Sequence, residues 1–310
     1  MPSSSDRDFT QPIIAAAVRV AGTVKAQVIM VYIDALENIE QFVGSVKGKT
    51  KVVFIARDEK DAKLAKAVNA QAVTVPAFNL TRMGQIKMAT IMAFSQGLLR
   101  GGETFVFVSG VIGHGLDTLV VMQVGAEYEL FQTVDQPKLT EHIRQVVFQR
   151  VLSIALALAH EGREGKPVGA LFVVGDFREV QKYCQQNIIN PFHGYTDKER
   201  NILDDGLTET VKEFATIDGA FVIKGTGVIA SAGTTLRPAM AGDDLPQGLG
   251  TRHLAAAAIT ASTKSIALTV SESTGNVRIW RRGKMITELE KAPRTPTPAP
   301  PSAKVEPGEG

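Results

Sequence analysis

In the first half of the chain, short apolar runs alternate with longer helix-forming segments. Residues 27–33, 51–55 and 104–108 are nearly continuous apolar runs of strand length, and residues 59–68 and 83–99 carry helix-forming side chains. Strands of a parallel sheet are buried on both faces and therefore read as continuous apolar runs separated by helices. The pattern predicts an α/β domain with a parallel sheet over residues 1–133.

The hydrophobic pattern changes after Pro137, where apolar residues recur at helical spacing up to residue 160. This periodicity predicts a long amphipathic helix over 139–160. We expect it to open a second, mixed α/β domain over residues 139–290, with a central sheet flanked by helices. The further elements predicted there are a strand at 168–174, a helical stretch ending near residue 184, a helix at 207–217, a hairpin of 220–223 and 228–231, a helix at 253–262, and strands at 265–270 and 276–280.

The last segment, residues 291–310, is rich in proline and poor in apolar residues. Such a segment cannot bury enough surface to offset the entropy lost on ordering. We predict a disordered tail.

The composition narrows the class of protein. A hydrophobic content of 44% supports a folded core, and a net charge of +2 gives no general reason to bind nucleic acid or an anionic membrane. The lone Cys184 excludes an intrachain disulfide and any multi-cysteine zinc site, which fits a reducing compartment. The first ten residues lack the apolar core of a signal peptide, and no apolar run is long enough to span a bilayer. We expect a cytoplasmic protein.

A first candidate for chemistry is the segment Asp218-Gly219-Ala220, between a predicted helix and a predicted strand. A carboxylate there can hold a divalent cation, and the glycine would let a ligand approach the backbone closely. Asp-Gly is also a common turn dipeptide, so an ordinary turn explains the segment equally well.

A second candidate is Gly250-Thr251-Arg252-His253, which directly precedes a predicted helix. Backbone N–H groups at a helix N-terminus favour anions, and the threonine and arginine add side-chain donors for phosphate. The alternative is a glycine turn followed by a threonine N-cap, with Arg252 in solvent.

Two further positions complete the candidate site. Ser271 and Glu272 close a predicted strand, so Glu272 could share a metal with Asp218, although a glutamate in a hairpin turn is the simpler interpretation. Leu236 could cover an adenine ring or belong to the core. His114 and His160 show no metal-ligand spacing, and we interpret them as structural or surface residues.

In order and spacing, these segments resemble the diadenylate cyclase domain, with the resemblance extending over residues 170–286. Gly175-Asp176 and Asn190-Pro191-Phe192 are similar to the branch of that family with an N-terminal α/β domain. The first half itself resembles the C-terminal domain of pyruvate kinase, which implies a regulatory or oligomerising role. Many family members have arginine directly after the histidine, whereas this chain has Leu254.

The resemblance implies an enzyme that condenses two ATP molecules into cyclic di-AMP and releases two pyrophosphates. Each protomer would bind one ATP, and two active sites would face each other in a homo-oligomer, with Mg²⁺ or Mn²⁺ as cofactor. An ATP-binding or cyclic-dinucleotide-binding sensor without turnover is the alternative, and a third possibility makes the first half a protein-interaction module. The implied catalytic residues are Asp218, Arg252 and His253; the implied metal ligands are Asp218 and Glu272; the implied ATP-binding residues are Gly219, Ala220, Leu236, Gly250, Thr251, Arg252, His253 and Ser271.

Overall fold

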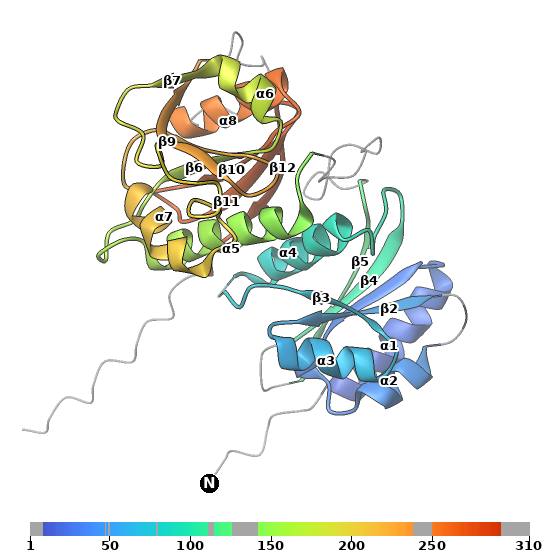
Figure 1. Ribbon diagram of the computed structural model, residues 1–310. Coiled ribbons are helices and arrows are strands. Elements are labelled where there is room, and N and C mark those ends of the chain that lie inside the picture. The colour runs from blue at the N-terminus through green and yellow to red at the C-terminus, as the bar shows by residue number, and fades with distance from the viewer. Residues whose placement is uncertain are drawn as a thin grey trace, which may run out of the picture.

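The computed structural model describes residues 9–46, 48, 50–78, 80–110, 115–125, 142–237 and 250–292. The chain forms two β-sheets with helices packed on them, one built from each half of the sequence (Figure 1). The predicted boundary between residues 133 and 139, the predicted tail from residue 293 onward and His114 lie outside the described residues. Across the described ranges, no helix is both long enough and apolar enough to cross a bilayer.

The first sheet has the strand order β3-β2-β1-β4-β5. β1, β2, β3 and β4 run parallel, which confirms the predicted parallel sheet, although no strand was predicted at β3; β5 pairs antiparallel with β4 at the edge. β5 was not predicted, although residues 119–122 form a short apolar run; in this edge strand only Met122 is fully buried. The strands are β1 (Val28–Tyr32), β2 (Lys51–Ala56), β3 (Gln71–Thr74), β4 (Thr104–Ser109) and β5 (Thr118–Gln123).

Local sequence signals set the helices of this half. In three of them the residue before the first turn, Asn38, Asp58 or Thr81, accepts a hydrogen bond from a backbone N–H three residues later. These side chains satisfy an N–H that the helix itself leaves without a partner. The helices are α1 (Thr10–Thr23), α2 (Ile39–Ser45), α3 (Glu59–Ala67) and α4 (Arg82–Ser95), with a 3-10 turn, η1, at Ile33–Ala35.

The second sheet has the order β12-β11-β10-β6-β8-β9-β7. It is a mixed sheet, because β6 and β8 pair in parallel while the other neighbours pair antiparallel, and it forms the predicted central sheet of a mixed α/β domain. The predicted helical stretch ending near residue 184 is confirmed as a short helix and a 3-10 turn, and the edge strand β7, which was not predicted, begins at Cys184. The strands are β6 (Ala170–Val174), β7 (Cys184–Gln186), β8 (Ala220–Ile223), β9 (Ile229–Leu236), β10 (Ile266–Val270), β11 (Val277–Arg281) and β12 (Lys284–Leu289).

Helices α5 (Gln145–Glu161) and α8 (Thr251–Ser262) cover opposite faces of this sheet. Alternate residues of the central strands separate between the two faces: Phe172 and Leu268 join the core that contains α5, whereas Val173 and Ala267 join the cluster that contains α8. The central strands are therefore buried on both sides. The remaining helical elements are α6 (Phe177–Val180), η2 (Gln181–Tyr183), η3 (Asp205–Leu207) and α7 (Thr208–Phe214).

The two halves meet where α4 packs against β12 (Figure 1). The buried Lys87 of α4 lies 3.4 Å from the carboxylate of Glu290, and the backbone N–H of Thr81 donates to the Glu290 carbonyl at 3.2 Å. The next residue, Lys291, donates from Nζ to the carbonyl oxygen of His160 at 2.9 Å, near the end of α5. The end of β12 is thus bonded to both halves of the molecule.

Candidate functional site

The structure brings Asp218, Arg252 and Glu272 together at one end of the second sheet. Asp218 directly precedes β8, and its side chain is 100% exposed. An Arg252 Nη2–H donates to Asp218 Oδ1 at 2.9 Å, and Arg252 Nη1 lies 3.7 Å from Glu272 Oε2. One guanidinium therefore lies between the two carboxylates that the sequence predicts as metal ligands.

Arg252 reaches this position because α8 begins at Thr251, two residues earlier than predicted. Gly250 occupies the N-cap position and provides no side-chain hydrogen bond to the first turn. The alternative of a threonine N-cap is wrong, because Thr251 is already helical. N–H groups in a first turn without a side-chain cap are available to a phosphate group.

Gly169, which precedes β6, makes room for the guanidinium and was missed from the sequence. A Cβ at this position would lie 2.8 Å from Arg252 Nη1 and 3.2 Å from Glu272 Cβ. A glycine just before a buried strand is a signal of close approach, but the sequence does not say what approaches. Any larger residue here would displace Arg252 from the two carboxylates.

The structure gives Gly219 a different role from the one expected. Its φ is +119°, and a Cβ would lie 2.5 Å from the carbonyl carbon of Gly233 and 2.6 Å from the nitrogen of Thr234. The space beside Gly219 is therefore filled by the backbone of β9 rather than left open for a ligand. This close contact fixes the position of Asp218 relative to the sheet.

The other predicted contact residues lie near the same end of the sheet. Ala220 pairs with Thr234 across an antiparallel ladder, and this register carries Leu236, two residues further along β9, toward Asp218. Leu236 is half-buried, so part of it remains open to a ligand. Ser271 is buried; its hydroxyl accepts from the N–H of Thr274 at 3.3 Å and orders the turn after β10.

His253 faces the interior instead of the open site. Its ring is 8% exposed and lies edge-on to Trp280, with ring centroids 6.1 Å apart. Burial, together with the nearby positive charge of Arg278, lowers the pKa of His253 to about 4, so the ring is neutral near pH 7. Among the described residues, its Nε2 finds no hydrogen-bond partner. This placement does not support the predicted phosphate contact and makes His253 a packing residue that positions α8.

The depressed pKa of His253 predicts a loss of stability in acid. The unfolded chain takes up a proton near pH 6.5, whereas the folded ring resists it until about pH 4. The contribution of His253 to the free energy of unfolding is therefore complete above pH 6.5. As the pH falls from 6.5 toward 4, the free energy of unfolding decreases by about 3 kcal/mol because of this residue. Urea denaturation at pH 7 and pH 4 should show this loss, and His253→Phe should lack it. Equal pH dependence in both proteins would contradict the assignment.

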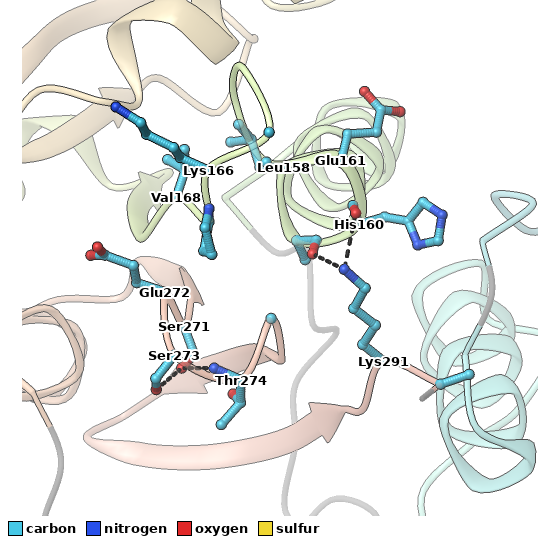
Figure 2. Close-up of a pocket in the computed structure, with 16 residues that line it drawn as sticks. Leu158, His160, Glu161, Lys166, Val168, Ser271, Glu272, Ser273, Thr274 and Lys291 are labelled. Atoms are coloured by element: carbon cyan, nitrogen blue, oxygen red, sulfur yellow. Dashed lines mark hydrogen bonds between the residues drawn. The ribbon is translucent and has the colours of Figure 1, made fainter. Parts of the chain in front are cut away.

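Two cavities adjoin the cluster, and both are lined by Lys166, Val168 and Glu272. The first, of about 410 Å³, lies between the end of α5 and the turn after β10, with Lys166 and Lys291 on different sides of it (Figure 2). The second, of about 350 Å³, includes Arg252. Lysines and hydroxyls around these cavities suit phosphate groups. In the part of the chain that the structure describes, no group of three or more metal-ligating side chains comes together.

Comparison with known proteins identifies relatives of both halves of the chain. Residues 157–285 match the family model DAC, described as "DisA bacterial checkpoint controller nucleotide-binding", and residues 10–133 match "Probable sensor domain DacZ_P". The diadenylate cyclase of Methanocaldococcus jannaschii is 39% identical over 182 residues, which cover 56% of this chain and 55% of that protein. The diadenylate cyclase of Haloferax volcanii is 35% identical over 212 residues, which cover 66% of this chain and 75% of that protein.

Among solved structures, a DacA double mutant from Staphylococcus aureus is 23% identical, covering 46% of this chain and 85% of that chain with a TM-score of 0.30. The fold and the matched models define a two-part α/β protein whose second half is of a nucleotide-binding class. The chain belongs to the diadenylate cyclase family, as the sequence predicts. The matched region spans about half the length of the M. jannaschii relative (55%).

Proposed function

We propose that the protein condenses two ATP molecules into cyclic di-AMP and releases two pyrophosphates. Membership of the diadenylate cyclase family supports this activity. The observation that carries it is the convergence of Asp218, Arg252 and Glu272 at the start of α8, where two carboxylates and a guanidinium can serve a metal-bound triphosphate. By the description of its matched model, the first half would act as a sensor domain attached to this activity.

In each step the 3′-hydroxyl of one ATP attacks the α-phosphorus of the other, and the bond to pyrophosphate breaks. The exposed carboxylate of Asp218 is available to orient that hydroxyl and take up its proton. Arg252 would neutralise charge that develops on the phosphate oxygens. The second step repeats the attack in the opposite direction, so two protomers must bring their sites face to face.

A divalent cation, Mg²⁺ or Mn²⁺, fits the donors present. Asp218 and Glu272 would hold it, with phosphate oxygens completing the shell, because Mg²⁺ in proteins usually takes one or two carboxylates plus substrate phosphates. When bound, the cation would lower the charge of the triphosphate and acidify the attacking hydroxyl. Arg252 pairs with both carboxylates, so a bound triphosphate would compete with them for the guanidinium and leave Asp218 and Glu272 to hold the cation.

Arg252→Ala is expected to weaken ATP binding by about 10–100-fold, the ~1.5–3 kcal/mol of a hydrogen bond to a charged group. Isothermal titration with a non-hydrolysable ATP analogue measures this directly. Arg178→Ala is the matched control, because Arg178 is an exposed arginine on α6, which follows the opposite end of the parallel pair β6 and β8. An unchanged affinity in Arg252→Ala would rule out the phosphate contact.

The alternative is a nucleotide sensor that binds without turnover. It is favoured by Leu254, which is 38% exposed where many family members have arginine. Incubating the purified protein with ATP and Mn²⁺ separates the two functions: cyclic di-AMP supports the enzyme, and binding without product supports the sensor. The cytoplasmic location stays a prediction from the sequence.

A further inference from the structure

Glu272 owes its position to the turn between β10 and β11, here called the Glu272 turn. Its side chain is 64% exposed, and its contact with Arg252 is long, at 3.7 Å. The turn is closed by its own backbone. The N–H of Ser271 donates to the Asn276 carbonyl at 2.9 Å, and the N–H of Gly275 donates to the Ser271 carbonyl at 2.9 Å. Whatever holds this turn in place therefore sets where the Glu272 carboxylate lies.

Lys291 packs against the Glu272 turn and joins it to the end of α5. A Cβ on Gly275 would lie 3.1 Å from Lys291 Cδ, so the lysine stem lies directly against that glycine. The backbone N–H of Lys291 donates to Asn276 Oδ1 at 3.4 Å. Its Nζ donates to the carbonyl oxygens of Ala159 and His160 at 3.0 and 2.9 Å (Figure 2). Carbonyl groups in the last turn of a helix lack partners within the helix and favour a cation, so this contact is stabilising.

The cavity of about 410 Å³ lies between the Glu272 turn and the end of α5. Open space, rather than packed side chains, separates the two elements there. Lys291 lines this cavity and contacts both of its walls. We therefore expect that loss of the lysine amino group would leave the turn free to shift.

Lys291 also contacts the first half of the chain. Its backbone pairs with Leu80 in an isolated antiparallel bridge just before α4. His160, which accepts from Lys291, faces Phe78 of the first half, with ring centroids 6.3 Å apart. A contiguous set of contacts therefore runs from the segment before α4 through Lys291 to the Glu272 turn.

We propose that Lys291 is a positioning residue that holds Glu272 in place and through which the first half acts on the metal-binding carboxylates. The inference rests on the proposed function, in which Asp218 and Glu272 hold the divalent cation. Residues that orient a metal ligand without touching the metal change metal affinity by about 10–100-fold when they are replaced. A shift of the segment before α4 would move Lys291 and the turn with it, so cation affinity would follow the state of the first half.

Lys291→Met removes the amino group but keeps a stem that can pack on Gly275. The measured quantity is the gain in affinity for a non-hydrolysable ATP analogue that saturating Mn²⁺ provides, by titration calorimetry with and without the metal. We expect this gain to fall about tenfold, the low end of the range, because Lys291 acts through the backbone of the turn. The affinity without metal should stay at the parent value.

Two variants serve as controls for Lys291→Met. Lys291→Arg should restore the gain from Mn²⁺, because a guanidinium can also donate to both carbonyl groups. Lys284→Met is the matched control, since Lys284 is an exposed lysine on the same strand, β12, and it should behave as the parent protein does.

Phe78→Ala tests the contact with the first half, because it removes the ring that faces His160. We expect it to lower the gain from Mn²⁺ by a smaller factor than Lys291→Met. The double variant should lose no more than Lys291→Met alone, because both changes act through one set of contacts. Leu64→Ala is the control, since Leu64 is 43% exposed on α3 in the first half. Additive losses in the double variant would show that the first half does not act through Lys291.

The outcomes separate this inference from the proposed function. A Lys291→Met protein with the parent's gain from Mn²⁺ overturns the positioning role, as does a parent protein whose analogue affinity is independent of Mn²⁺. Equal losses of affinity with and without metal would make Lys291 a residue that stabilises only the fold, and would overturn it too. If the parent protein makes no cyclic di-AMP but Lys291→Met lowers the gain as expected, the positioning role stands and the proposed activity fails.

Discussion

Asp218→Asn is expected to lower cyclic di-AMP formation by about 10²–10⁴-fold, the range for loss of a group that moves a proton in the reaction. The amide cannot take up a proton and is a much poorer ligand for a divalent cation. The fold should be unaffected, because the side chain is fully exposed and its ion pair with Arg252 is a surface pair. The free energy of unfolding should change by less than about 0.5 kcal/mol.

Chromatography of the product and urea denaturation measure the two quantities. Asp205→Asn is the matched control, because Asp205 is 93% exposed and pairs with Arg150 at 2.7 Å, much as Asp218 pairs with Arg252. The control should keep full activity. Cyclic di-AMP production by Asp218→Asn at the parent rate would refute both the metal and the proton role of this carboxylate.

Gly219→Ala should lower the free energy of unfolding by about 2–5 kcal/mol. Two costs add: an alanine at φ +119° is strained, and its Cβ would lie 2.5 Å from the carbonyl carbon of Gly233, so β8 and β9 must move apart. Activity should fall as well, because Asp218 depends on this contact for its position. Urea denaturation of both proteins measures the stability difference.

Gly250→Ala provides the comparison, since both glycines are predicted to contact ATP. Gly250 has an ordinary φ of −69°, and a Cβ there would meet no atom of the described residues within 4 Å. The free energy of unfolding of the Gly250→Ala protein should differ from that of the parent by only about 0.5 kcal/mol, the difference between glycine and alanine at an N-cap. A Gly219→Ala protein as stable as Gly250→Ala would show that the contact between β8 and β9 is less restrictive than the structure indicates.

The sequence predicts best those elements that are buried on both sides. The apolar runs that predict β1, β2, β4, β6, β8 and β10 are confirmed, because burial on both faces leaves a continuous apolar signature. Edge strand β7 carries no such signature: its side chains are half-buried or exposed, and it pairs with β9, which is distant in sequence. Edge strand β5 does contain an apolar run next to its partner β4, but it was not predicted. β12 was likewise not predicted.

Part of the candidate site could also be predicted from the sequence. Asp218 and Arg252 stand out by chemistry, and their proximity follows from a strand start and a helix start at the same end of one sheet. The role of Gly169 and the burial of His253 depend on which atoms fold against them, and Trp280 reaches His253 from the strand β11. Local sequence patterns carry no information about such contacts.

The bond between α4 and the end of β12 also has a consequence for the order of events during synthesis. Glu290 contacts Thr81 and Lys87, which precede it by 209 and 203 positions. At ~5–20 residues per second, the ribosome adds that carboxylate roughly 10–40 s after Lys87. For that interval the face of α4 that later meets β12 is open to water. The contact between α4 and β12 can therefore form only after the last strand, β12, has been synthesised. How long α4 stays exposed depends on how quickly β12 then joins the second sheet.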